Sequence, residues 1–138
     1  MSGPQLSDVW TAAGVLLGLQ GVVFTGRIRR EVEVGDQGGP TWLAVADMVN
    51  LASVLTIIGG VFVLPIFIPN AIAKYALGLA VTLFAGHLIA VAGHYELYNP
   101  STSRSADHFP RQERIVVWSV AAVAVVYVFA AILYAISN

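Results

Sequence analysis

The fold is decided by one stretch of sequence, MVNLASVLTIIGGVFVLPIFIPNAIA, which runs from Met48 to Ala73 without an acidic or basic residue. Three further stretches are equally free of charged residues, namely Val9–Gly26, Tyr75–Tyr95 and Ile115–Asn138. Each has at least the roughly 17–25 residues that a helix needs to cross a hydrocarbon layer about 30 Å thick. Because lipid offers no hydrogen-bond partner to the backbone, we expect each stretch to be helical.

The composition is typical of a membrane protein. Hydrophobic residues make up 57% of the 138 residues and charged residues only 11%, whereas about a quarter of a soluble domain is charged. We therefore predict an all-α integral membrane protein, a single domain over 1–138. Its four transmembrane helices, at about 7–26, 43–66, 71–95 and 114–136, form an up-down bundle. The chain has no cysteine, which excludes disulfides, thiolate metal sites and cysteine nucleophiles.

The basic residues predict the sidedness of the chain. Six of the seven follow the first and third spans, namely Arg27, Arg29, Arg30, Arg104, Arg111 and Arg114. By the positive-inside rule, the loops after spans one and three are cytoplasmic and both termini are non-cytoplasmic. We expect these arginines to contact anionic lipid headgroups, and the membrane to be a cytoplasmic (plasma) membrane.

The loops after the first two spans differ in character. Pro65 and Pro69 end the second span, so that spans two and three form a tight antiparallel hairpin. After span one, Arg27–Val34 either continues the helix into the cytoplasm or forms a short strand. The segment 35–40, rich in glycine and ending in proline, then breaks that element.

Two helix faces carry small residues at a helical spacing. The first face has Gly14, Gly18 and Gly21, and the second has Gly78, Gly86 and Gly93. Small residues let helices approach closely in lipid, where the hydrophobic effect does not drive association. One stripe could pack within the protomer and the other between protomers, or both could lie inside the bundle. The expected partners are the lipid bilayer and either further copies of the chain or a larger membrane protein, with no indication of nucleic acid binding.

Four polar residues inside or at the edge of the spans form the candidate functional site: Asp47, Asn50, His87 and His94. The short hairpin is expected to bring Asn50 level with His87, and Asp47 to a depth between the two histidines. An aspartate beside a histidine stabilises the protonated imidazole, and histidine changes charge near physiological pH. The cluster therefore predicts a pathway or gate for protons or small ions. Because four helices are too few to enclose a channel, we expect a homo-oligomer to form it.

The same residues also have a structural interpretation. Asp47 could cap the second helix, and Asn50 with His87 could join two helices by a hydrogen bond of about 0.6 kcal/mol. His94 could be an interfacial residue. The chain would then be a non-catalytic accessory or scaffold subunit of a larger complex. The two interpretations differ in one observable, because a pathway needs Asp47 and His87 to meet water, whereas a scaffold needs them paired and dry.

Enzymatic chemistry is not expected. The sequence has no Gly-x-Ser-x-Gly, His-Glu-x-x-His or phosphate-loop motif. His87 and His94 lie two turns apart, about 10 Å along one helix, which is too far for one metal ion. We therefore expect neither metal nor cofactor. A haem b held by two copies of His87 across a dimer axis is the distant alternative, because the spans place histidines on one helix only.

Overall fold

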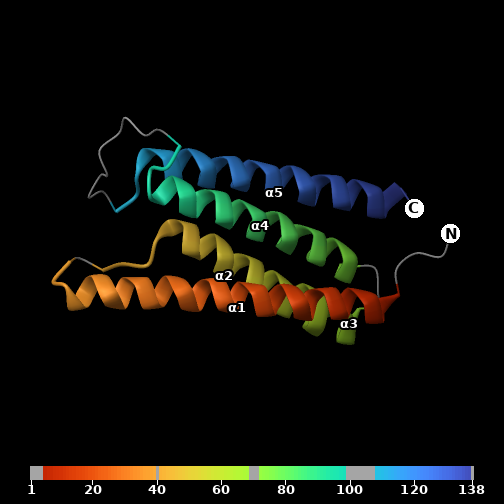
Figure 1. The fold of residues 1–138 in the computed structure, drawn as a ribbon. Helices are drawn as coiled ribbons and strands as arrows, with labels where there is room; N and C mark the ends of the chain where they lie inside the picture. The colour runs from red at the N-terminus through yellow and green to blue at the C-terminus, as the bar shows by residue number, and fades with distance from the viewer. Residues whose placement is uncertain (1–4, 40, 69–71, 99–107, 138) are drawn as a thin grey trace.

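The computed structural model describes residues 5–39, 41–68, 72–98 and 108–137 (Figure 1). Every regular element within these ranges is helical, which confirms the all-α prediction for them. Four helices are long and apolar enough to cross a membrane. In chain order the elements are α1 Leu6–Asp36, α2 Val45–Ile57, η1 Ile58–Val63, α3 Leu64–Phe67, α4 Ile72–His94 and α5 Arg111–Ser137. The π-helical turn η1 joins α2 to α3, so these three elements together make the second spanning helix.

Helix α1 continues well beyond the first apolar stretch. Its 31 residues span about 46 Å at 1.5 Å per residue, whereas the hydrocarbon layer is about 30 Å thick. Of the two alternatives for Arg27–Val34, the structure takes the helix. The helix then ends in a Schellman motif, in which Gly38 has a φ of 77° and the N–H of Gly39 donates to the carbonyl of Val34 at 2.9 Å.

Consecutive spanning helices run in opposite directions, so the start of α1 and the end of α5 lie at the same end of the bundle (Figure 1). Helix α4 packs along both α2 and α5, and α1 packs along α2 and α4. Helices α1 and α5 therefore lie on opposite sides of the α2–α4 pair (Figure 1).

The two glycine stripes have different surroundings. A Cβ added at Gly86 would lie 2.5 Å from Val120, and one added at Gly93 would lie 2.9 Å from the backbone nitrogen of Glu113. Gly78 likewise faces the ring of Tyr127, so this stripe faces α5 inside the bundle. In contrast, an added Cβ at Gly14, Gly18 or Gly21 has no neighbouring atom within 4 Å among the described residues. The stripe of Gly14, Gly18 and Gly21 therefore lies on the outer surface of α1.

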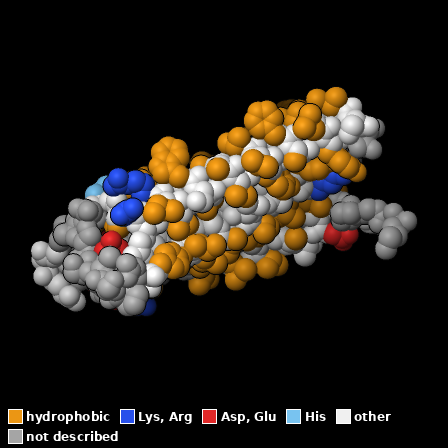
Figure 2. Space-filling model, turned by 90° about the horizontal axis from the view of Figure 1, so that it is seen from above, with side chains coloured by type: hydrophobic (Ala, Val, Ile, Leu, Met, Phe, Trp, Pro, Cys, Tyr) orange, Lys and Arg blue, Asp and Glu red, His pale blue; other side chains and the backbone are white. Residues whose placement is uncertain are grey.

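The interior divides into two halves along the bundle. Near the start of α1, the buried side chains are apolar and come from α1, the second span and α4: Val9, Ala13, Leu16, Ile57, Val61, Ala73, Ala76 and Ala80. Toward the other end, the buried set includes polar and charged side chains: Gln20, Arg27, Asp47, Asn50, Ser53, His87 and Glu113. Outside, hydrophobic side chains cover the length of the visible face, and charged side chains gather toward its two ends (Figure 2). This surface suits contact with a lipid bilayer.

Candidate functional site

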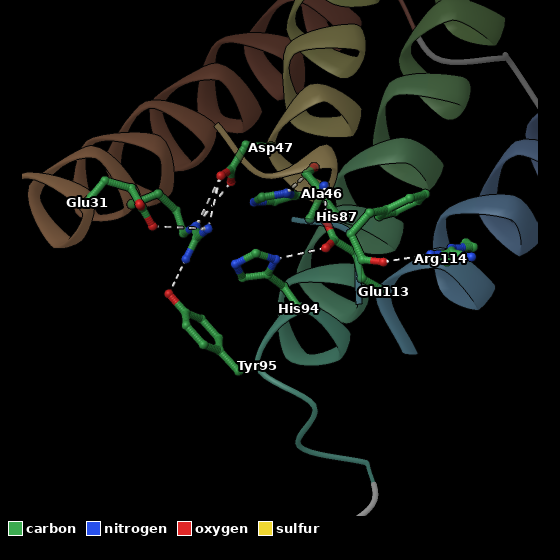
Figure 3. Close-up of polar contacts among 10 residues, drawn as sticks. Glu31, Ala46, Asp47, His87, His94, Tyr95, Glu113 and Arg114 are labelled. Carbon is green, nitrogen blue, oxygen red and sulfur yellow. Dashed lines mark hydrogen bonds and ion pairs between the residues drawn. The ribbon is translucent and has the colours of Figure 1, made fainter. Parts of the chain in front are cut away.

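Charged and polar side chains from all four spanning helices meet at one end of the bundle, where α1 passes the first turn of α2, the end of α4 and the first turn of α5 (Figure 3). We call this group the charged cluster; its members are Arg27, Asp47, His94, Tyr95 and Glu113. Two pairs lie within it, the Arg27–Asp47 ion pair and the His94–Glu113 hydrogen-bonded pair, and each pair joins different helices.

The first pair joins α1 to α2. The guanidinium of Arg27 donates to the carboxylate of Asp47, with Nη2 3.1 Å from Oδ2 and Nε 3.2 Å from both oxygens. Arg27 is 7% exposed and Asp47 1% exposed. Arg27 also donates to the hydroxyl of Tyr95, and the carboxylate of Glu31 lies 4.0 Å from Nη2. Asp47 is thus paired with Arg27 instead of His87, and Arg27 points into the bundle instead of toward a lipid headgroup.

The second pair is centred on Glu113, which is fully buried in the first turn of α5. One carboxylate oxygen accepts from the backbone N–H of Ala46 at 2.6 Å, and the other lies 2.8 Å from Nδ1 of His94. The N–H of Ala46 belongs to the first turn of α2, where backbone donors have no partner within the helix and an anion is favoured. Glu113 therefore caps α2 from a different helix, and His94 is paired at the end of α4.

His87 is fully buried between α2 and α4. Its Nδ1 lies 2.8 Å from the carbonyl oxygen of Ala46, so Nδ1 must carry the proton and donate it. Its other nitrogen, Nε2, has no hydrogen-bond partner in the described part of the chain. The buried position inside one bundle gives no support to a haem shared by two copies of His87.

We expected Asn50 to lie at the same depth in the bundle as His87. Instead, Ala46, one helical turn earlier on α2, lies at that depth and is hydrogen-bonded to His87. Between Gly60, which abuts Ala76, and Ser53, which bonds the carbonyl of Ala80, the second span uses seven residues where α4 uses four. The start of η1 lies in this interval and contributes to the difference. A π-helical turn holds more residues than an α-helical turn, and a register counted on ideal α-helices does not include this.

A smaller polar group lies deeper in the bundle. Gln20 donates through Nε2 to the hydroxyl of Ser53 at 2.5 Å, and that hydroxyl donates to the carbonyl of Ala80 at 2.6 Å. Asn50 is fully buried on α2 nearby, and neither atom of its amide has a partner among the described residues. This group links α1, α2 and α4 near the apolar half of the interior.

A cleft of about 470 Å³ opens on the α1 side of the charged cluster. Its lining includes Phe24, Glu31 and Trp42, together with Arg27 and Asp47. The pair nevertheless exposes little surface, as given above. Within the described ranges, no group of three or more His, Cys, Asp or Glu side chains could hold a metal ion.

The remaining predicted headgroup residues fall into two sets. Four of them are exposed, namely Arg29, Arg30, Arg111 and Arg114, and Arg114 also donates to the carbonyl of Phe109 at 3.1 Å. Arg104 lies outside the described residues.

Sequence reasoning missed Arg27, Glu113 and Gln20 as interior residues. For Arg27 the signal was present, because the buried positions of α1 recur at helical spacing: Val9, Ala13, Leu16, Gln20 and Arg27. Extending the helical face by seven residues from Gln20 leads to Arg27. For Glu113 we find no comparable signal, since its role depends on how α5 meets α2.

Comparison with protein-family models, with curated proteins and with solved structures finds no match. The function must therefore be argued from the residues of this chain.

Proposed function

We propose that this small helical membrane protein is a non-catalytic accessory or scaffold subunit, whose polar interior fixes its own helix arrangement. The observation that carries this proposal is the buried Arg27–Asp47 ion pair, in which Arg27 is 7% exposed and Asp47 is 1% exposed. A pathway would need Asp47 to meet water, whereas here its carboxylate accepts three hydrogen bonds from one guanidinium. His87 is buried and bonded to the backbone of Ala46.

The apolar half of the interior supports the same proposal. Between Ser53 and the end of the bundle where α1 starts, the buried side chains from α1, the second span and α4 are aliphatic, as in Ala13, Ile57 and Ala76. Among the described residues, an ion crossing through one copy of the bundle would meet no fully buried polar side chain in this half. A charge at the centre of a bilayer costs about 2.5–3.5 kcal/mol even on the most permissive scales.

The outward glycine stripe of α1 is the surface that we propose for association with a second copy or a larger membrane protein. An added Cβ at Gly14, Gly18 or Gly21 meets nothing within 4 Å, and small residues allow close approach of a neighbouring helix. We further propose that the charged cluster faces the cytoplasm of a plasma membrane, with both termini on the other side, since six of seven basic residues follow spans one and three.

A conduction pathway remains the second candidate, and one observation favours it. His87 Nε2 and the amide of Asn50 are polar, buried and without a partner among the described residues. Groups of this kind line routes for protons through membrane proteins.

Flux through proteoliposomes distinguishes the two candidates. Purified protein would be tested under an imposed pH gradient and under a membrane potential, together with Asp47→Asn and His87→Ala. We expect all three proteins to give the leak of empty vesicles, because the charges are paired and half of the interior is apolar. Flux in the wild type that disappears in His87→Ala would overturn the scaffold proposal in favour of the pathway.

The association surface can be tested with unique cysteines, because the chain has none of its own. Gly18→Cys lies on the outward stripe, and Leu19→Cys, at a position 54% exposed on another face of α1, is the matched control. Oxidation in native membranes should link Gly18→Cys, either to a second copy or to a cysteine-bearing neighbour, much more than it links the control. Equal linking at both positions would argue against a specific surface on this stripe.

A further inference from the structure

The deeper polar group and the neighbouring His87 hold four buried polar atoms without a hydrogen-bond partner in the described part of the chain. They belong to three side chains, Gln20, Asn50 and His87, which we call the amide site; each is fully buried. The atoms are Gln20 Oε1, both atoms of the Asn50 amide and His87 Nε2, and none has a partner among the described residues. A buried polar atom left unsatisfied costs about 1–3 kcal/mol, so four of them call for a bound partner.

Helix geometry brings the three side chains toward one another. Asn50 lies four residues after Ala46, which bonds His87, and three residues before Ser53, which bonds Gln20. Positions three and four apart share one face of a helix. Asn50 therefore lies between the level of His87, about 6 Å away along the axis, and the level of Gln20, about 4.5 Å away.

The donors and acceptors at the amide site do not balance. Since His87 Nδ1 donates to a carbonyl, Nε2 of the neutral ring is an acceptor. The single hydroxyl proton of Ser53 goes to the carbonyl of Ala80, so Ser53 accepts from the Gln20 amide nitrogen and leaves Gln20 Oε1 as an acceptor. With Asn50 Oδ1 there are three acceptor atoms, which offer five lone pairs, against three N–H donors: two on Asn50 Nδ2 and the second one on Gln20 Nε2.

We propose that the amide site binds ordered water, which donates to His87 Nε2 and connects it through Asn50 toward Gln20. Water supplies two donors and two acceptors and is uncharged, which matches a site of neutral groups with a surplus of acceptors. Buried waters typically make about three hydrogen bonds to polar groups that the protein leaves unsatisfied. Three residues that take part in the hydrogen bonds around the site, Ala46, Ser53 and Ala80, have small side chains.

Such water would give His87 a role beyond that of a scaffold, because Nε2 would be a hydrated hydrogen-bond acceptor inside the membrane. The structure also places a limit on hydration. The water would end at the apolar half of the interior, where Ile57 and Val61 are fully buried, so the site is a closed pocket of water and not a continuous file across the membrane.

Water-edited solid-state NMR of the full chain in proteoliposomes tests the proposal directly. We expect magnetisation from water to reach the His87 ring and the Asn50 side chain much faster than it reaches Ile57 and Val61. The ring nitrogen shifts should show a proton on Nδ1 and none on Nε2. Transfer to His87 and Asn50 that is as slow as transfer to Ile57 and Val61 would overturn the proposal.

A variant then tests the role of Asn50. Asn50→Leu should slow transfer from water to His87 toward the rate of Ile57, because water loses its second partner. Thr56→Val is the control on the same helix, since the Thr56 hydroxyl donates to the carbonyl of Ala52 within its own helix. Unchanged transfer to His87 in Asn50→Leu would contradict a water bound between the two residues, and the wild-type measurement stands on its own if this variant does not fold.

Discussion

Replacing Asp47 by alanine should destabilise the bundle strongly, because it leaves the guanidinium of Arg27 buried without its anion. The charged atoms are 3.1 Å apart, a separation at which the Coulomb energy is about 5 kcal/mol at an effective dielectric constant of about 20. Removing one partner of a buried ion pair generally costs about 3–5 kcal/mol. Glu31 lies 4.0 Å from the same guanidinium, with its side chain 26% exposed, and can compensate in part. We therefore expect a loss of about 3 kcal/mol.

The assay is the free energy of unfolding in bicelles, measured by steric trapping or by titration with a denaturing detergent. Asp36→Ala is the matched control, since this carboxylate is exposed at the same end of α1 and should change the free energy by no more than about 0.5 kcal/mol. In a double-mutant cycle with Arg27→Met, removal of both charges should cost less than the sum of the single changes, with a coupling of about 2–3 kcal/mol.

Two results would refute this reasoning. One is a cost for Asp47→Ala that matches the cost for Asp36→Ala. The other is additivity of Arg27→Met and Asp47→Ala, which would mean that the two side chains do not interact in the folded protein. Either result would also remove the observation on which the scaffold proposal rests.

Two further predictions use the same assay. Glu113→Gln removes the charge that pairs with His94 and caps α2, and should cost about 1.5–3 kcal/mol, the usual contribution of a hydrogen bond to a charged group; a cost no larger than that of Glu33→Gln, at an exposed position, would contradict it. Gly93→Ala places a Cβ 2.9–3.0 Å from the backbone of α5 and should cost about 1–3 kcal/mol as overpacking, whereas Gly14→Ala has open space and should be neutral or stabilising by up to about 1 kcal/mol. The opposite order for the two alanine variants would refute the placement of the two stripes.

The spanning helices were predictable from the sequence because lipid imposes a simple rule. An uncharged stretch of about 20 residues in lipid has to satisfy its own backbone, and a helix does so. The same rule misplaced Arg27. The charge-free stretch ends at Gly26, which suggests that Arg27 belongs to a polar loop, yet α1 continues to Asp36 and its buried face includes Arg27.

The candidate site was only partly predictable, for two physical reasons. Asp47, Asn50 and His87 are all buried, but Asp47 pairs with Arg27 and not with His87. Their partners depend on the register between α2 and α4, which a count on ideal α-helices does not reproduce in a span that contains the π-helical turn η1. The role of Glu113 depends on how the first turn of α5 meets α2, and the sequence pattern of α5 does not indicate this.

The polar contacts explain how four apolar helices can adopt one arrangement in lipid. Apolar surfaces alone give helices little preference for one neighbour over another, because the lipid chains are equally apolar. Here Arg27 and Asp47 join α1 to α2, and Gln20 with Ser53 joins α1, α2 and α4. Glu113 joins α5 to α2 and α4.

Each of these contacts requires one particular set of neighbours, since a slip of any helix would leave a charge or an amide unsatisfied at a cost of about 1–3 kcal/mol or more. Buried ion pairs often contribute little net stability but can specify which helices meet. We infer that the charged cluster serves this purpose, and the double-mutant cycle at Arg27 and Asp47 separates the two effects. If the cluster specifies the arrangement, the double variant should recover much of the stability lost by Asp47→Ala, but its helices should pack in more than one way. Multiple resonances for Gly93, where α4 meets α5, would report that heterogeneity, whereas a single sharp resonance would show that packing alone is sufficient.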